Sequence, residues 1–163
     1  MSEAAPPADA SARHWDEWQA QHSLAPPRFT DWGDHPTILK LIYQTVFGSA
    51  ETGFLEHLAQ TYPQFARAHA LSLCCGDGAF ERHLVAQGVF GSVTGIDVSP
   101  ARIALAQQQR ADLAPRLDFE VGDVNAGEFG QQRFDVVFAK AALHHVENLE
   151  ALVRGIRAAL RPG

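Results

Sequence analysis

Residues 71–81 read LSLCCGDGAFE and join an apolar run directly to a glycine turn. The run begins at Ala70 and is typical of a buried strand, and Gly76 and Gly78 follow at its end. Because glycine has no Cβ, a ligand can contact the backbone of such a turn. The pattern predicts a strand, a tight ligand-facing turn and a helix over residues 80–87. A Gly-x-Gly turn alone is weak evidence, since ordinary strand-to-helix turns also contain it.

The same alternation of strand and helix continues along the chain. Apolar runs predict further strands at residues 92–96, 117–121 and 134–139. Helical spacing of apolar residues predicts helices at residues 36–47, 53–62, 100–111 and 148–160. Ser99 is suited to cap the helix that starts at Pro100. Alternating strands and helices indicate an α/β fold with a parallel sheet, which binds its ligand at the carboxyl ends of the strands.

The chain before this α/β unit divides into two predicted segments. Residues 1–13 are rich in alanine and proline and offer little to bury, so a disordered tail is expected. Residues 14–69 are expected to form an N-terminal helical extension. Its first part contains four large aromatic side chains, Trp15, Trp18, Phe29 and Trp32. Such side chains are costly to leave in water, so this part either packs on the domain, which is the simpler interpretation, or covers the active site as a lid.

Composition excludes several classes of function. The 163-residue chain is 46% hydrophobic, enough for one globular domain with a core. Its net charge of -6 and the lack of a dense Lys/Arg patch argue against nucleic acid partners. The adjacent Cys74 and Cys75 cannot easily form a relaxed disulfide, which fits the cytoplasm. We expect no signal peptide and no membrane span, because no apolar run is long enough.

A second motif lies at the end of the next predicted strand. Asp97 stands in the sequence GIDVS, residues 95–99, and follows Gly76 by 21 residues. This spacing brings its carboxylate beside the glycine turn, where it can accept both hydroxyls of a ribose. The alternative is that Asp97 only caps the following helix. Ser99 already suits that role, so we favour the ribose interpretation.

Glu81 bears on which nucleoside is bound. A dinucleotide site places a helix N-terminus against pyrophosphate, and the carboxylate of Glu81 in the first helical turn would repel it. The sequence also has no Gly-Lys-Ser/Thr motif for a triphosphate. A positively charged nucleoside without phosphate, such as S-adenosyl-L-methionine, fits better.

These motifs resemble those of the Rossmann-like S-adenosylmethionine-dependent methyltransferases, especially the small-molecule group called methyltransferase type 11/12 domains. The resemblance covers residues 70–163, the predicted partial cofactor-binding domain. It rests on four blocks in the family's order, residues 71–80, 95–100, 119–124 and 134–149, and on a terminal turn at residues 160–163. It implies a Rossmann-like parallel sheet with helices on both faces. It also implies methyl transfer to a small-molecule, sugar or lipid-like acceptor.

The resemblance implies a cofactor site made of Cys75, Gly76, Gly78, Asp97, Val98, Asp123, Val124 and Lys140, with no metal. In this interpretation Gly76 and Gly78 lie under the methionine and ribose parts of the cofactor. Asp97 binds the ribose hydroxyls and Val98 packs on the adenine.

The remaining implied contacts come from the third and fourth strands. Asp123 would accept the adenine amino group, and the backbone of Val124 would meet the ring. The alternative for Asp123 is a common turn residue. Ala139 and Lys140 would border the methionine moiety.

Two positions depart from the family pattern. Ser72 stands where the family usually has an acid that helps to organise the amino group of the cofactor. Cys74 stands where the family usually has glycine. We interpret Cys74 and Cys75 as small buried hydrophobic residues.

The sequence KAALHHV at residues 140–146 resembles a stretch found in many small-molecule methyltransferases, where the loop faces the methyl group. A neutral imidazole of His144 or His145 could there accept a proton from a substrate hydroxyl, so both are candidate catalytic residues. The alternative is that one histidine caps or packs the following helix. The Asn/Asp-Pro-Pro-aromatic signature of methyltransferases acting on nucleic acid or protein amines is absent from the sequence, which also favours a small-molecule substrate.

The family normally continues beyond Gly163, so four of its usual seven strands are expected here. The fourth strand, residues 134–139, would then lie at an open edge through which the chain could form an oligomer. We favour a C-terminally truncated chain over a natural fragment or a protein that has lost activity. Two other functions remain open: a non-catalytic S-adenosylmethionine-binding or partner module, and an NAD-dependent oxidoreductase.

Overall fold

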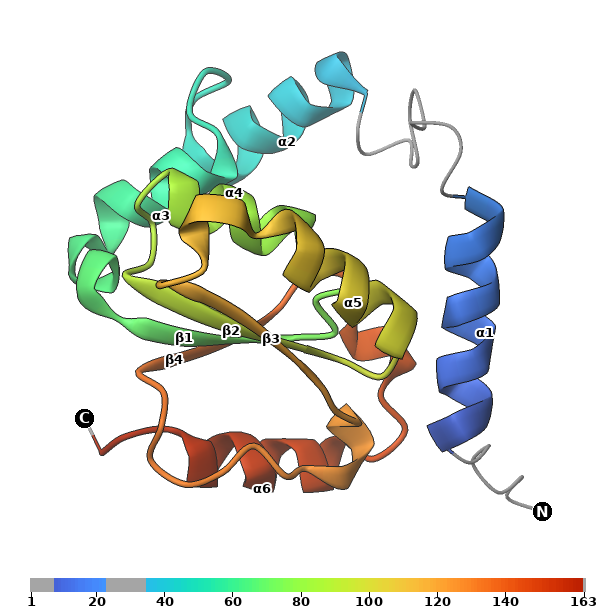
Figure 1. Ribbon diagram of the computed structural model, residues 1–163. Helices are drawn as coiled ribbons and strands as arrows, with labels where there is room; N and C mark the ends of the chain where they lie inside the picture. The colour runs from blue at the N-terminus through green and yellow to red at the C-terminus, as the bar shows by residue number, and fades with distance from the viewer. Residues whose placement is uncertain (1–7, 23–34, 163) are drawn as a thin grey trace.

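The computed structural model describes residues 8–22 and 35–162. Its four parallel strands form one sheet in the order β3-β2-β1-β4 (Figure 1). The strands are β1 (His69–Leu73), β2 (Ser92–Asp97), β3 (Leu117–Val121) and β4 (Val136–Ala139). The predicted α/β fold with a parallel sheet is therefore confirmed. Each predicted strand is present, with ends shifted by two residues or fewer.

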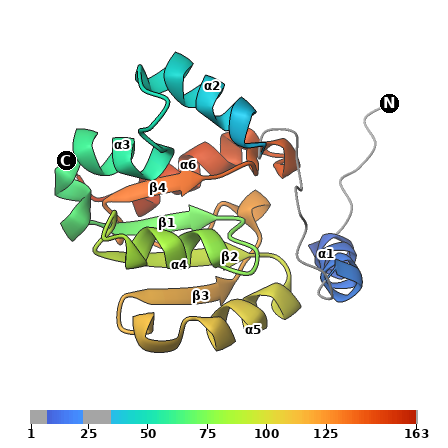
Figure 2. The ribbon, with the colours of Figure 1, turned by 90° about the horizontal axis from the view of Figure 1, so that it is seen from above.

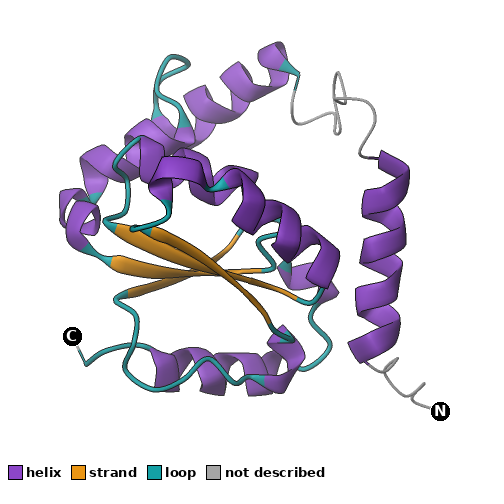
Figure 3. Ribbon diagram, viewed as in Figure 1, coloured by secondary structure: helices purple, strands orange, loops and turns teal. Residues whose placement is uncertain are grey.

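Helices cover both faces of the sheet, as Figure 3 shows. One face carries α4 (Ala79–Ala86) and α5 (Pro100–Gln109), and the other carries α6 (Leu149–Ala159). The N-terminal part contributes α1 (Ala8–His22), α2 (Pro36–Phe47) and α3 (Phe54–Thr61). Short 3-10 turns complete the chain at Pro63–Arg67, Ala111–Leu113, Val124–Ala126 and Leu143–His145. None of the described helices has the length and apolar character needed to cross a bilayer.

Helix α1 begins earlier than the composition predicted. Residues 8–13 were expected in the disordered tail, but they form the first turns of α1. Alanine has the highest helix propensity, and the helix gains tertiary contacts with α5 that no local pattern reveals. Residues 1–7 and the predicted docking residues Phe29 and Trp32 lie outside the described residues.

The core consists of two apolar clusters, one on each face of the sheet. Alternate residues of β1 feed both: Ala70 belongs to the cluster under α4 and α5, and Leu71 belongs to the cluster over α6. Phe119 and Phe134 are the largest fully buried side chains of the two clusters. Burial on both faces explains why these strands read as apolar runs rather than as alternating patterns.

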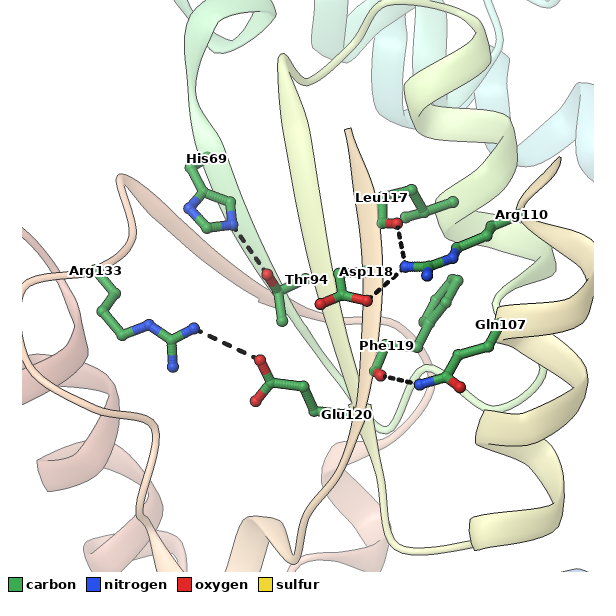
Figure 4. Close-up of polar contacts among 9 residues, drawn as sticks. All are labelled: His69, Thr94, Gln107, Arg110, Leu117, Asp118, Phe119, Glu120 and Arg133. Atoms are coloured by element: carbon green, nitrogen blue, oxygen red, sulfur yellow. Dashed lines mark hydrogen bonds and ion pairs between the residues drawn. The ribbon is translucent and has the colours of Figure 1, made fainter. Parts of the chain in front are cut away.

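Side chains from the end of α5 hold the outer strand β3 in place (Figure 4). Gln107 donates to the backbone oxygen of Phe119 at 2.8 Å. Arg110, at the C-cap of α5, donates to the carboxylate of Asp118 at 2.6 Å. On the opposite face, the ion pair between Arg133 and Glu120 spans 3.6 Å. These contacts attach β3 to α5 and to the segment before β4.

The fourth strand lies at an edge of the sheet, as predicted, but the start of that edge is not bare. Phe134 forms a parallel bridge with Leu160. Its amide donates to Ala159 at 3.1 Å, and its carbonyl accepts from Arg161 at 2.9 Å. Residues 136–139 have β1 as their only strand neighbour among the described strands. An oligomer through this edge remains a prediction.

Candidate functional site

A cavity of about 530 Å³ lies at the carboxyl ends of the strands. Its walls come from the loops after all four strands, from the start of α5, and from α1. Figure 2 shows α1 standing beyond the strand ends, so that the helix closes one side of the cavity. This is the edge of an open α/β sheet where ligands bind.

Seven of the ten predicted site residues line this one cavity: Asp97, Val98, Asp123, Val124, Lys140, His144 and His145. They come from three different loops, which the strand order brings together. The other three, Cys75, Gly76 and Gly78, do not line it.

Asp97 organises the floor of the cavity. Its Oδ2 accepts from the Gly76 amide at 2.8 Å, and its Oδ1 accepts from the Ser99 amide at 3.0 Å. Asp97 therefore also shapes the turn before α5, while the Ser99 hydroxyl caps the helix by accepting from the Arg102 amide at 3.2 Å. A carboxylate has about four acceptor positions, so both oxygens of Asp97 can still accept a ligand hydroxyl.

Gly78 and Cys75 form the underside of the glycine turn. Gly78 has φ +69°, and a Cβ there would lie 2.6 Å from Cε1 of Phe119. The Cys75 side chain packs into the core cluster under α4, and burial raises the pKa of its thiol above the ordinary range. The side chain of Cys75 thus belongs to the core, so only its backbone can serve the predicted cofactor site.

Cys74 does line the cavity, although we expected only a buried hydrophobic residue there. Its backbone has φ +55°, a left-handed conformation that residues other than glycine rarely adopt. Burial raises the pKa of the Cys74 thiol to about 12, so the sulfur is not a nucleophile at neutral pH.

The left-handed backbone predicts that glycine suits position 74 better than alanine. Both Cys74→Gly and Cys74→Ala remove the thiol, but only glycine relieves the strain. We expect the glycine variant to be more stable than the alanine variant by about 1 kcal/mol in urea unfolding. Equal stability of the two variants, or a more stable alanine variant, would contradict a strained turn.

Glu81 does not face the cavity, and this corrects the predicted repulsion of a diphosphate. Its side chain is buried, and Oε1 accepts from the Ser72 hydroxyl at 2.6 Å. Burial raises the pKa of the Glu81 carboxyl, and the Ser72 hydrogen bond opposes that shift. Glu81 of α4 therefore brings a carboxyl group next to Ser72, which stands where the family usually has an acid. Glu81 therefore gives no reason to exclude a diphosphate from the cavity.

Helix α1 is attached to the start of α5. The carboxylate of Asp16 accepts from the Ser99 hydroxyl and from the Ala101 amide, the latter at 3.3 Å. The helix packs on α5, as the simpler interpretation predicted, and its Trp15 and Trp18 line the cavity; a lid role for it stays a prediction. Sequence reasoning missed Arg102, which also lines the cavity. Its contacts come from α1, which is distant in the sequence, so no local pattern signalled it.

The tandem histidines lie in the turn after β4, next to α1. The ring of His145 meets Trp15 edge-on at 5.2 Å between centroids, and His144 lies 3.8 Å from His145. Burial and the neighbouring His144 lower the pKa of His145. The lowered pKa favours the neutral imidazole of His145, the form that can accept a proton. Within the described ranges, no group of three His, Cys, Asp or Glu side chains is placed to hold a metal ion.

Comparisons with known proteins agree with this geometry. Residues 70–163 match a family model described as a methyltransferase domain. The chain is 36% identical over 97 residues to a ubiquinone biosynthesis O-methyltransferase from Methylobacterium nodulans, covering 58% of this chain and 38% of that protein. It is 27% identical to phosphoethanolamine N-methyltransferase 3 from Arabidopsis thaliana, covering 91% of this chain and 31% of that protein.

Solved structures give the same fold. An S-adenosylmethionine-dependent methyltransferase from Mesorhizobium loti is similar with a TM-score of 0.57 and 29% identity, over 65% of this chain and 48% of that one. The [4+2]-cyclase SpnF is similar with a TM-score of 0.71 over 100% of this chain and 60% of that one; at 19% identity it shows the fold alone. The chain spans well under half the length of the two curated relatives described above.

Proposed function

Because the chain belongs to the methyltransferase domain family over residues 70–163, we propose that it binds S-adenosyl-L-methionine and transfers the methyl group to a small-molecule acceptor. By name, one relative is an O-methyltransferase of ubiquinone biosynthesis and the other is an N-methyltransferase of phosphoethanolamine. Oxygen and nitrogen acceptors therefore both occur among similar proteins. An acceptor of sugar or lipid-like character is included in the proposal.

The observation that supports this function best is the position of Asp97 beside the Gly76 turn, at the floor of the cavity. In the proposal both Asp97 oxygens accept the ribose hydroxyls, and Val98 packs on the adenine. Asp123 already accepts from the Asn125 amide through Oδ1 at 2.9 Å, which leaves Oδ2 for the adenine amino group. The cavity has the volume typical of small-ligand sites.

The charge of the walls also suits this cofactor. Three acids line the cavity, Asp97, Asp123 and Glu147, together with two bases, Arg102 and Lys140. The excess of one negative charge favours a positively charged ligand. When bound, the cofactor supplies a methyl group that is already activated by its sulfonium. The work left to the protein is to hold the acceptor in line and to exclude water, which α1 and the loop at residues 140–146 can do.

His145 is the better of the two candidate bases, because its lowered pKa favours the neutral form and because its ring contacts Trp15. We expect the methyl-transfer rate to fall as pH drops through the lowered pKa of His145, which is below about 6.5. His145→Asn should remove this acid limb and reduce the rate by about 100-fold. The control is His83→Asn, on the exposed face of α4. An unchanged pH profile in the His145 variant would rule out this base.

Methyl transfer itself is testable with methyl-labelled S-adenosylmethionine and a panel of phenols, amines, sugars and lipid headgroups. We expect label in at least one small molecule and none in nucleic acid, since the net charge of -6 opposes phosphate backbones. Cofactor binding without transfer to any acceptor would favour the non-catalytic module instead.

A further inference from the structure

Arg102 stands out among the cavity residues because two indole rings enclose its guanidinium. Cζ lies 5.1 Å from the ring centroid of Trp15 and 5.1 Å from that of Trp18. Its Nε donates to Gln19 at 3.4 Å. Three residues of α1 thus hold one side chain of α5 at the wall of the cavity.

No carboxylate of the described residues pairs with this guanidinium. Three other arginines of the described residues do pair with carboxylates: Arg110 with Asp118, Arg133 with Glu120, and Arg161 with Asp135. Arg102 has aromatic faces and an amide oxygen instead. A partly buried guanidinium without an anion is poorly compensated, so an anionic ligand group would complete its surroundings.

The position of the guanidinium indicates which ligand group this is. A Cβ added at Gly76 would lie 3.4 Å from both Cζ and Nη1 of Arg102. The terminal nitrogens therefore lie against the Gly76 turn, over which the family resemblance places the ribose of the cofactor and its methionine part. That part ends in a carboxylate, the group that a planar guanidinium binds best through two parallel hydrogen bonds.

We propose that Arg102 binds the carboxylate of the methionine moiety, and that Trp15 and Trp18 hold its guanidinium in place. This inference rests on the proposed function. The two tryptophans already restrict the side chain of Arg102, so less conformational entropy is lost when the carboxylate binds. Helix α1 is therefore a part of the cofactor site and not only a cover.

The test compares two ligands that differ in this group. S-adenosylhomocysteine carries the carboxylate, whereas 5′-methylthioadenosine keeps the adenosine and the sulfur but lacks the amino acid. Isothermal titration of both into Arg102→Gln should give an affinity for S-adenosylhomocysteine at least about tenfold lower than in the unchanged chain. The affinity for methylthioadenosine should stay within about twofold.

A matched control is Arg110→Gln, which removes the same charge from the other end of α5, outside the cavity. It should change neither affinity. Trp18→Leu should reproduce a smaller loss that is again selective for S-adenosylhomocysteine. Circular dichroism melting of each variant checks that the fold is retained.

The other outcomes overturn the inference in distinguishable ways. An equal loss for both ligands would mean that Arg102 only shapes the pocket, and a gain for both would mean that it blocks the pocket. No change for either would show that it does not contact the ligand. If the unchanged chain bound neither ligand, the proposed function itself would fail.

Discussion

Asp97→Ala should lower the affinity for S-adenosylhomocysteine by about 100-fold or more. Two hydrogen bonds from ribose hydroxyls to a charged acceptor contribute about 1.5–3 kcal/mol each, and 1.4 kcal/mol corresponds to a factor of ten. The variant also leaves the buried Gly76 amide without its acceptor, which loosens the turn under the ligand. Isothermal titration of the purified chain measures the change.

The matched control for this variant is Asp112→Ala, which removes an exposed carboxylate outside the cavity. It should leave the affinity unchanged. Asp97→Asn separates the two roles of the residue, since its amide oxygen can still serve the turn but carries no charge. If Asp97→Ala bound the ligand as well as the unchanged chain, Asp97 would be a turn residue alone.

Gly78→Ala should destabilise the fold by about 3 kcal/mol or more. Two effects add: a left-handed backbone costs a side chain about 1–2 kcal/mol, and overpacking a filled core costs about 1–3 kcal/mol. The second effect arises because the new Cβ would lie 2.6 Å from Cε1 of Phe119, a fully buried ring in the cluster under α5. Urea unfolding followed by circular dichroism gives the free energy of unfolding.

Gly88→Ala isolates the backbone effect. Gly88 has φ +70°, close to that of Gly78, but a Cβ there would meet nothing within 4 Å. This variant should lose only about 1 kcal/mol. Equal losses at the two positions would mean that the Phe119 ring moves aside without cost, and that Gly78 is required only for its conformation.

The order of strands and helices could be predicted because buried parallel strands and amphipathic helices have clear periods in the sequence. The capping of α5 by Ser99 was also readable, since capping depends on a few adjacent residues. The boundaries of α1 were not, because residues 8–13 form a helix that gains its support from α5 rather than from its own pattern.

The site was predictable where it depends on the ends of strands, and not where it depends on the direction of a side chain. Asp97 and Asp123 follow strands and reach the cavity through the topology alone. Glu81 occupies the first turn of α4, but packing turns it toward Ser72. Arg102 becomes a cavity residue only because α1, distant in the sequence, lies across it.

The most direct measurement is the titration of the unchanged chain with S-adenosylhomocysteine and, separately, with NAD+. We expect saturable one-to-one binding of S-adenosylhomocysteine and no binding of NAD+, with Asp97→Ala abolishing most of the affinity. A folded chain that failed to bind S-adenosylhomocysteine, or that bound NAD+ more tightly, would contradict the proposed cofactor.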